Sequence, residues 1–402
     1  MKIGFLTVGT EILLGDTVNT NLTNLGKLLN DAGFQLDKEI TISDNETEIK
    51  TALDFLLSEC DVVITSGGLG PTEDDITKET ISKSLGLKLE LDEVHLEWMK
   101  ERWKARGLMM PETNTKQAYI PKGSEKLTNT QGTAPAIKIN SNNKFIFIFP
   151  GPPREFIPLV KDELIKFLNE NFEQKETDYQ FVMFFNQAES SLASKINDFK
   201  PEGLDIAYLA SKGIIKLRFD RSSVEKEDAD QFLKKLDEIF SDDILAYENV
   251  SVEKVLSNMI IKNNIKISFA ESITGGMISS LLIRNPGMSQ HFIGSDVIYT
   301  TDSKTLLLNN ELDETEDWEE LSYNLTISSL EKYGSDIALT ILGEAGPISS
   351  SKYPIGTIFI CISNGEKTVV SDHKMKGNRV EIIERSTNKA YWELIKFIKN
   401  LN

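Results

Sequence analysis

Short apolar runs alternate with amphipathic stretches over the first part of the chain. The runs Lys2 to Val8, Asp61 to Thr65 and Phe145 to Phe149 have the length and composition of buried strands. Asn21 to Ala32 and Thr47 to Ser58 carry apolar residues at helical spacing. Strands that alternate with helices predict a parallel sheet with helices on both faces, and ligands of such sheets bind at the carboxyl ends of the strands. We therefore expect an α/β fold with its chemistry in the loops that follow these strands.

The pattern changes after Pro150-Gly-Pro-Pro153, which ends the last of these strands. Arg154 to Asn171 is then predicted to be helical. The remaining predicted strands are Phe181 to Phe185, Ile214 to Phe219, Lys266 to Ala270, Asp336 to Leu342 and Gly356 to Ile362, and the remaining predicted helices are Asp228 to Phe240, Arg379 to Ile398 and one that begins near Val252. The acidic segment Glu311 to Glu320 is interpreted as a solvated turn or helix face.

A chain of 402 residues is too long for one ordinary hydrophobic core. We predict three domains: a parallel-sheet domain over residues 1–170, a small α+β middle domain over residues 171–248 that serves as a spacer or packing domain, and a C-terminal α/β domain over residues 249–402. The formal net charge of −18 repels phosphate backbones at long range, which disfavours extended DNA or RNA binding. A small phosphorylated ligand stays open, because a metal or backbone amides in a local pocket can outweigh the global charge.

Cysteine and histidine are scarce in this chain. The two cysteines, Cys60 and Cys361, lie in or beside apolar runs and are predicted to be buried thiols rather than a disulfide. The three histidines are scattered, which argues against a structural zinc site. The first residues turn polar at Gly9-Thr-Glu11, and no apolar run approaches the roughly 20 residues that span a bilayer, so we expect a soluble, cytoplasmic protein.

One loop combines glycines with acids: Ser66-Gly-Gly-Leu-Gly-Pro-Thr-Glu-Asp-Asp-Ile-Thr77. The glycines that allow the backbone to approach a ligand, and to expose amides to an anion, are Gly67, Gly68 and Gly70. Asp74 or Asp75 would hold a divalent cation beside that anion, and a helix that begins at Thr77 directs its positive end there. The residues alone leave a plain strand-to-helix connection equally open.

This loop resembles the pattern of MoaB/MogA-like molybdopterin-binding domains, with Asp75 and Thr77 in register, and the whole chain resembles the CinA family of competence/damage-inducible proteins. The further segments that carry the resemblance are Gly9-Thr-Glu-Ile-Leu-Leu-Gly15, Asn19-Thr-Asn21, Pro111-Glu-Thr-Asn-Thr-Lys-Gln-Ala118, Asn129-Thr-Gln-Gly-Thr-Ala-Pro135 and Phe149-Pro-Gly-Pro-Pro153. The resemblance implies that the first domain hydrolyses ADP-ribose to AMP and ribose 5-phosphate with a divalent metal, for which Mg, Co and Mn are candidates.

The resemblance also implies roles for individual residues of the first domain. Asp75 is expected to hold the metal or to position the water, and Asp44 is expected to support it. A metal held by carboxylates would neutralise the diphosphate and direct a water at phosphorus. The residues expected to contact the substrate are Gly9, Glu11, Asn19, Asn21, Gly67, Gly68, Gly70 and Thr77. Helix capping is an equally good account of the two asparagines.

A second candidate site is Ala270-Glu-Ser-Ile-Thr-Gly-Gly276, which also follows a predicted strand. Ser272 has no obvious partner histidine, which favours a Ser-Lys arrangement with a desolvated, neutral Lys304 as the base. Taken alone, a helix-capping serine and a surface lysine are the simpler account. Together with Tyr299-Thr-Thr-Asp-Ser-Lys304, however, the segment resembles the nicotinamide-nucleotide amidohydrolase (PncC-type) domain of the same family.

That resemblance implies deamidation of nicotinamide mononucleotide to nicotinate mononucleotide. Ser272 is then the nucleophile, Lys304 its base and Tyr299 a hydrogen-bonding partner. The residues expected to bind the phosphate or the oxyanion are Thr274, Gly275 and Gly276. A monovalent cation is a further candidate cofactor.

The C-terminal segment also departs from the family pattern. Where the family has a glycine-rich loop, this chain has Gly343-Glu-Ala-Gly-Pro-Ile-Ser-Ser350. Glu344 occupies the position of an apolar residue in the family pattern, and the final glycines of that pattern are lost. Tyr323 and Ile273 are further departures. We expect the Ser-Lys pair to be kept and Glu344 and Tyr323 to fill or recharge the substrate pocket, so this second site is a candidate for degeneracy.

Two other functions stay open. One is a binding protein that holds a nucleotide or a molybdopterin-like ligand without turnover, with a degenerate C-terminal domain. The other is the DNA-handling role suggested by the family's name, against which the acidic charge and the lack of a basic stripe argue. The expected partners are therefore small nucleotides, with no membrane and no nucleic acid, and the resemblance implies a homodimer.

Overall fold

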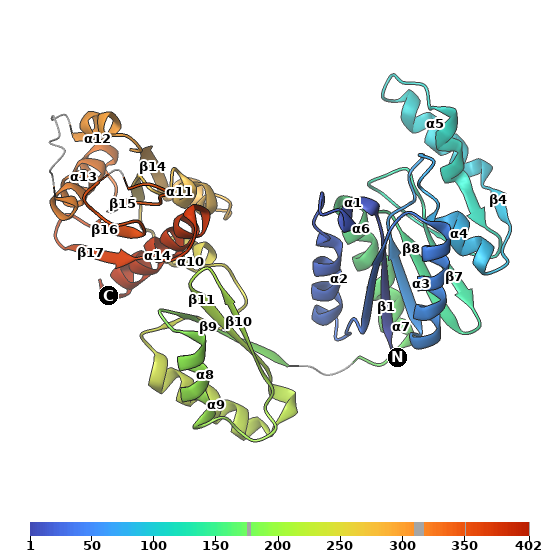
Figure 1. The fold of residues 1–402 in the computed structure, drawn as a ribbon, viewed down its shortest axis with the longest axis horizontal. Helices are drawn as coiled ribbons and strands as arrows, with labels where there is room; N and C mark the ends of the chain where they lie inside the picture. The colour runs from blue at the N-terminus through green and yellow to red at the C-terminus, as the bar shows by residue number, and fades with distance from the viewer. Residues whose placement is uncertain (175–177, 309–316, 350, 402) are drawn as a thin grey trace. The chain divides into compact units, whose positions relative to one another are not determined.

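The computed structural model shows two compact units, Met1–Glu176 and Thr177–Asn402 (Figure 1). The described residues are 1–174, 178–308, 317–349 and 351–401. Six residues of the acidic segment interpreted above, 311–316, lie outside the described part; Asp317 caps a helix, and the next three residues begin it. Among the described helices, none is long and apolar enough to cross a membrane.

The first unit is built on a six-stranded sheet in the order β2-β1-β3-β8-β7-β6. Its strands are β1 (Ile3–Val8), β2 (Lys38–Ile42), β3 (Val62–Ser66), β6 (Glu125–Leu127), β7 (Ala136–Ser141) and β8 (Lys144–Phe149). The first four in this order are parallel, which confirms the predicted parallel sheet, whereas β7 is antiparallel to both neighbours. The chain reverses between β7 and β8 at Asn142 and Asn143, whose positive φ angles asparagine tolerates.

Helices cover both faces of this sheet (Figure 1). One face carries α2 (Thr20–Asp31), α6 (Pro153–Leu159), a π-helical turn (Val160–Leu164) and α7 (Ile165–Asn171), and the other carries α3 (Glu46–Glu59) and α4 (Thr77–Ser84). The remaining elements are α1 (Thr10–Leu13), β4 (Leu89–Leu91), α5 (Glu93–Lys104), a 3-10 helix (Glu112–Ala118) and β5 (Tyr119–Pro121). Phe5 of β1 packs into the first of these cores and Leu6 into the second, because successive side chains of a strand point to opposite faces.

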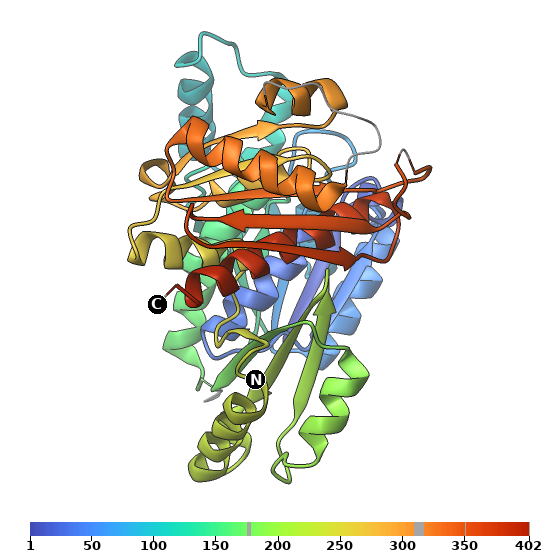
Figure 2. The same cartoon turned by 90° about the vertical axis from the view of Figure 1, so that its left-hand side faces the viewer.

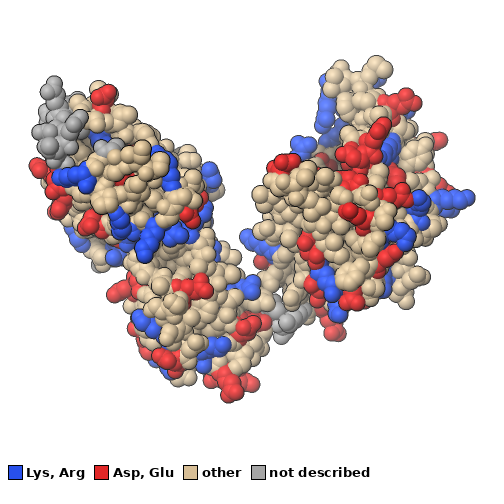
Figure 3. All heavy atoms as spheres, in the orientation of Figure 1, with Lys and Arg blue, Asp and Glu red and all other residues tan. Residues whose placement is uncertain are grey.

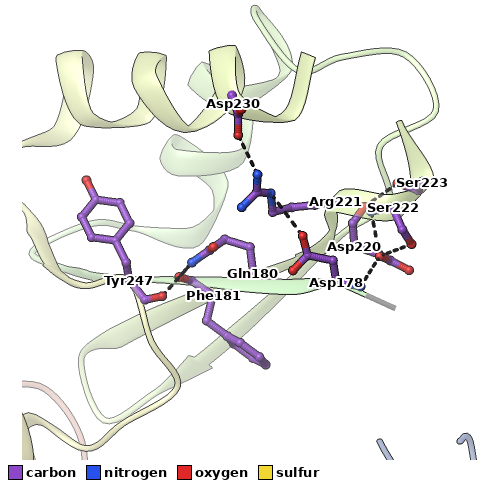
Figure 4. Close-up of polar contacts among 9 residues, drawn as sticks. All are labelled: Asp178, Gln180, Phe181, Asp220, Arg221, Ser222, Ser223, Asp230 and Tyr247. Carbon is purple, nitrogen blue, oxygen red and sulfur yellow. Dashed lines mark hydrogen bonds and ion pairs between the residues drawn. The ribbon is translucent and has the colours of Figure 1, made fainter. Parts of the chain in front are cut away.

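The second unit begins with an antiparallel sheet in the order β10-β11-β9-β12. Its elements are β9 (Tyr179–Phe185), α8 (Glu189–Asn197), β10 (Ile206–Ser211), β11 (Ile214–Asp220), α9 (Lys226–Phe240) and β12 (Ile244–Ala246). Arg221 joins three of them, because its guanidinium lies 3.5 Å from Asp178, before β9, and 2.6 Å from Asp230 of α9 (Figure 4). Gln180 of β9 donates to the Tyr247 carbonyl at 2.7 Å, which fixes the chain that leaves β12.

A five-stranded sheet follows, in the order β14-β13-β15-β16-β17. Its strands are β13 (Ile267–Glu271), β14 (Phe292–Val297), β15 (Ile337–Gly343), β16 (Thr357–Ser363) and β17 (Thr368–Lys374), and its helices are α10 (Val252–Lys262), α11 (Met277–Leu282), α12 (Thr301–Leu308), α13 (Trp318–Tyr333) and α14 (Arg379–Lys399). β13 is parallel to β14 and β15, and the last three strands are antiparallel. Figure 2 shows α13 (orange) and α14 (red) on opposite sides of the β16–β17 pair.

One hydrophobic core of the second unit is shared by its two sheets, while the other face of the antiparallel sheet packs against α8 and α9 in a core of its own. Met183, Phe185 and Ile214 belong to the same buried cluster as Trp392 of α14, and the rings of Phe185 and Trp392 stack with centroids 5.2 Å apart. The segment predicted as a spacer or packing domain is therefore joined to the C-terminal sheet by apolar contacts. Cys60 and Cys361 are buried free thiols, as predicted.

Candidate active sites

A cavity of about 510 Å³ lies at the carboxyl edge of the first sheet. Its walls come from the loops that follow β1, β3 and β8, whose ends are aligned by the parallel register Thr7 with Ser66 and Ser66 with Phe149. The predicted residues among its lining are Gly9, Glu11, Asn19, Asn21, Asp44, Gly67, Gly68, Gly70, Asp74 and Asp75. The structure thus brings together ten positions spread over the first 75 residues.

The glycines of the loop after β3 pack closely against protein atoms. Gly67 has a φ of 106°, and a side chain there would meet the Val8 carbonyl oxygen at 2.1 Å. A methyl group at Gly70 would lie 2.3 Å from an oxygen of Asp75, and one at Gly68 would lie 2.0 Å from the hydroxyl of Thr77. These glycines are needed for the loop to fold, in addition to any contact with a ligand.

The two predicted acids hold the walls of the cavity in place. Asp75 Oδ2 accepts hydrogen bonds from the amide and the hydroxyl of Thr72, at 3.0 and 2.5 Å. Among the described groups, none donates to its other oxygen, Oδ1. Asp44 Oδ2 accepts from the amide and hydroxyl of Thr10, both at 2.8 Å, and so ties the loop after β2 to the start of α1.

The two asparagines form hydrogen bonds within the fold, whereas the hydroxyl of Thr77 is buried without a partner among the described residues. Asn19 caps α2 by accepting from the amide of Leu22 at 3.1 Å, which bears out the capping alternative at this position. Asn21 is buried within α2 and donates to Ser66 at 2.9 Å and to the Gly151 carbonyl at 2.7 Å, while its own Oδ1 is buried without a partner among the described residues. Thr77 is fully buried beneath Gly68 and is not part of the described cavity lining.

The cavity offers oxygen atoms of the kind that hard divalent cations bind. Its lining contains the carboxylates of Glu11, Asp44, Asp74, Asp75 and Glu155. In the described part of the chain no three His, Cys, Asp or Glu side chains converge on one point. Mg²⁺ is commonly held by one or two carboxylates together with substrate phosphates, so oxygen donors of this kind fit it. Asp75, through Oδ1, and Asp74 are the residues that would hold the ion.

We expect Gly70→Ala to lower the free energy of unfolding of the first unit by about 1–3 kcal/mol, because the methyl group must displace Asp75. Gly26→Ala is the matched control, since this glycine lies in α2 with no atom within 4 Å of the added carbon. It should stabilise the chain by about 1 kcal/mol through helix propensity. Urea unfolding followed by circular dichroism measures both, and equal stability of the two variants would contradict the packing described here.

The second candidate site lies where β13 ends. Ser272 is 7% exposed, and its amide donates to the Ile341 carbonyl of β15 at 3.0 Å. The amide of Ile298 donates to the Glu271 carbonyl at 2.9 Å, which brings the Tyr299 segment beside Ser272 in the sheet. The carboxyl ends of β13, β14 and β15 therefore assemble the serine, the tyrosine and the Glu344 loop along one edge.

Glu271, the residue before the serine, organises the following loop. Its carboxylate is fully buried and accepts from Thr274 at 2.8 Å and from the amides of Ile278 and Ser279 at 3.0 and 2.9 Å. These two amides open helix α11. The helix start that was expected to bind a phosphate or an oxyanion is thus occupied by the chain's own carboxylate.

Thr274, Gly275 and Gly276 line a separate cavity of about 1020 Å³, together with Tyr208 and Arg284. Neither Ser272 nor Lys304 is among the described residues that line this cavity. The structure therefore separates the expected phosphate-binding residues from the expected nucleophile and base, because the loop turns them toward the β10–β11 hairpin.

Lys304 lies on α12 and is partly buried. Burial lowers the pKa of its ammonium group, and the carboxylate of Glu344 acts in the opposite direction. Glu344 itself is 5% exposed. A lysine with a lowered pKa is what a Ser-Lys mechanism requires.

Tyr299 has a partner that was not predicted. Its hydroxyl accepts a hydrogen bond from Arg379 at 2.5 Å, and the same guanidinium donates to the Gly346 carbonyl. Arg379 thereby connects the tyrosine to the loop that departs from the family pattern. Of the other departures, Ile273 is buried against Gly343 and Tyr323 is 44% exposed on α13.

The chain is similar to known proteins over almost its whole length. Residues 4–170 match the family model described as "Probable molybdopterin binding domain", and residues 249–398 match the CinA C-terminal domain. A competence-damage inducible protein from Clostridium botulinum is 35% identical over 401 residues, covering 97% of this chain and 98% of the relative. The chain belongs to the CinA family. A member from Acetivibrio thermocellus is 33% identical over the full length of both chains.

Among solved structures, CinA from Thermoplasma acidophilum, described as having unknown function, is 36% identical and has a TM-score of 0.38. The match covers 41% of this chain and 96% of the Thermoplasma acidophilum chain.

Three residues of this CinA chain were missed by sequence reasoning: Glu155, Glu271 and Arg379. Glu155 is 7% exposed, lines the first cavity and accepts from Asn129 at 2.8 Å. Its position two residues after Pro150-Gly-Pro-Pro153 was a usable signal, since that motif ends a strand at the ligand edge. Glu271 stands beside the serine within a quoted motif. Arg379 is the first residue of a distant helix, and no local pattern indicates its contact with Tyr299.

Proposed function

We propose that this CinA-family chain hydrolyses the pyrophosphate bond of ADP-ribose to AMP and ribose 5-phosphate in the cavity of the first unit. The observation that carries the proposal is the convergence of ten predicted residues, four of them acids, on one cavity of about 510 Å³. That volume lies within the usual range for small-molecule sites.

Each group has a task in this reaction. The divalent metal neutralises the diphosphate when it is bound. Asp75 uses Oδ1 to hold the ion or to orient the water, since Thr72 fixes its other oxygen. Asn21 offers its unpartnered Oδ1 to a hydroxyl of the substrate. The water oxygen forms a bond to one phosphorus as the bond from that phosphorus to the bridging oxygen breaks, the bridging oxygen leaves on the phosphate of the other product, and the two protons of the water pass to solvent.

Metal removal tests this proposal against the non-catalytic alternative. The protein is treated with EDTA, then supplied with Mg²⁺, Mn²⁺ or Co²⁺ and ADP-ribose, and AMP is measured by liquid chromatography. We expect no AMP in EDTA and many turnovers after metal is restored. Stoichiometric binding of ADP-ribose with no product under any of the three metals would favour the binding protein.

We also propose that the second site deamidates nicotinamide mononucleotide, on the grounds that Lys304 is partly buried and interacts with Glu344, whose loop lies at the same sheet edge as Ser272. Ser272 Oγ attacks the carboxamide carbon while Lys304 takes its proton. The C–N bond breaks, and the lysine returns the proton to the leaving ammonia. Water then hydrolyses the acyl-enzyme and releases nicotinate mononucleotide.

Glu344→Gln is expected to shift the pH dependence of this deamidation to lower pH. The base must be neutral, so activity rises as pH increases through the pKa of Lys304. Glu344 raises that pKa, and its removal lets desolvation lower it further. The dependence of kcat/KM on pH measures the effect, with the exposed Glu366→Gln as control. A rising limb that stays in place or moves to higher pH would exclude Lys304 as a base influenced by Glu344.

A further inference from the structure

The titratable side chains that line one small cavity in the second unit are all basic. It measures about 330 Å³ and lies between the end of β9, the turn before β11, the end of β17 and helix α14. Its lining residues are Phe185, Asn186, Gly213, His373, Lys374, Met375, Lys376, Arg385 and Lys389. Every titratable side chain in this lining is a base, in a chain with 62 acidic and 44 basic residues. Figure 3 shows Lys and Arg side chains gathered over α14 on the same part of the molecule.

Two of these cations, Lys376 and Arg385, form no ion pair and no side-chain hydrogen bond with any residue in the described ranges. Arg385 lies one helical turn before Lys389 on the same side of α14, and only Lys389 has an acidic partner, Glu393, among the described residues. A bound anion would supply the counter-charge that Arg385 lacks.

Lys389 gives the cavity a rigid wall. It is 7% exposed, and its ammonium group lies 2.8 Å from Glu393 and donates to Asn186 at 3.1 Å. The same group lies 5.4 Å from the centre of the Phe185 ring. The cavity is therefore preformed by both sheets of the unit, while Arg385 offers a planar fork of donors suited to two oxygens of one anion.

We propose that this cavity binds a phosphoryl group, held by Arg385 and Lys376 with Lys374 and His373 at its edge. The group would come either from free inorganic phosphate or from a phosphomonoester such as AMP. The proposal is independent of the two reactions above, because none of their residues lines this cavity among those described.

Histidine NMR provides a local test on the full-length protein. The chain has three histidines, and only His373 lines this cavity, so His95 and His291 are internal controls. Burial lowers the pKa of His373, Lys389 and Lys396 lower it further, and Glu393 and Asp372 raise it. The ring also contacts the Ser371 hydroxyl at 3.0 Å. A dianion next to the imidazole favours its protonated form, so 10 mM inorganic phosphate should raise the pKa of His373 by about 1.

Matched variants connect the shift to the unpaired cations. The double variant Lys376→Gln with Arg385→Gln should weaken phosphate binding at least about tenfold by isothermal titration calorimetry and abolish the His373 shift. Lys399→Gln, an exposed lysine at the end of α14, should change neither. Circular dichroism checks that all variants are folded.

A comparison of probes identifies the source of the phosphoryl group. Binding of AMP at least tenfold tighter than phosphate, with the same His373 shift, indicates a phosphomonoester, and equal affinities indicate free phosphate. The proposal is overturned if His373 shifts no more than His95 and His291, or if the double variant binds phosphate as the unmodified protein does. The His373 shift and phosphate binding do not depend on either enzymatic activity. The phosphoryl-site proposal and the two proposed reactions can therefore fail independently of each other.

Discussion

Asp75→Asn is expected to reduce AMP formation from ADP-ribose at least about 100-fold with the protein still folded. Asparagine keeps an oxygen that can accept the two hydrogen bonds of Thr72, so the turn is preserved. It loses the negative charge with which Asp75 would hold the metal or orient the water. The measurement is kcat/KM for ADP-ribose at saturating Mg²⁺.

Glu73→Gln is the matched control for this prediction, because Glu73 is an exposed acid of the same turn that does not line the described cavity. Its activity should stay within a factor of about two of the unmodified protein. Unchanged hydrolysis by Asp75→Asn would show that Asp75 only stabilises the turn, and equal losses in both variants would indicate a general effect of charge.

Lys304→Ala and Ser272→Ala should each reduce deamidation of nicotinamide mononucleotide by at least about 100-fold, and together by no more than the larger single effect. The two residues act in one step, because Lys304 takes the proton of Ser272 as the serine oxygen attacks. Either change therefore prevents formation of the same activated nucleophile. Mass-spectrometric detection of nicotinate mononucleotide measures all three variants. Lys262→Ala, an exposed lysine of α10, is the control.

The combined variant is the informative one. Additive losses would mean that serine and lysine contribute separately, and deamidation that survives both changes would remove the proposed pair. Because Lys304 is partly buried and Ser272 almost fully, thermal unfolding of each variant must be compared with that of the unmodified protein.

Much of the first domain could be predicted because local patterns there coincide with tertiary structure. The apolar runs at Lys2 and Asp61 become β1 and β3, and the glycine-acid loop lies at their carboxyl ends because parallel strands end at one edge. The antiparallel β6–β7 pair was not predicted, since β6 has only three residues and depends on β7 for its hydrogen bonds.

The second unit was harder to predict because its decisive contacts are long-range. Glu271 accepts hydrogen bonds from the helix start at which the sequence predicted a ligand, and Arg379 donates to Tyr299, 80 positions away in the chain. Thr274 faces a cavity shared with the β10–β11 hairpin, which only the folded arrangement of the two sheets creates. No spacing along the chain carries that information.

On our proposal, one chain holds two separate hydrolytic sites. The most direct test is mass-spectrometric product analysis of one mixture of ADP-ribose, nicotinamide mononucleotide and Mg²⁺, incubated in parallel with the unmodified protein, Asp75→Asn and Lys304→Ala. We predict both sets of products from the unmodified protein, only nicotinate mononucleotide from Asp75→Asn, and only AMP with ribose 5-phosphate from Lys304→Ala. Absence of either product from the unmodified protein, or loss of both products in one folded variant, would contradict the claim.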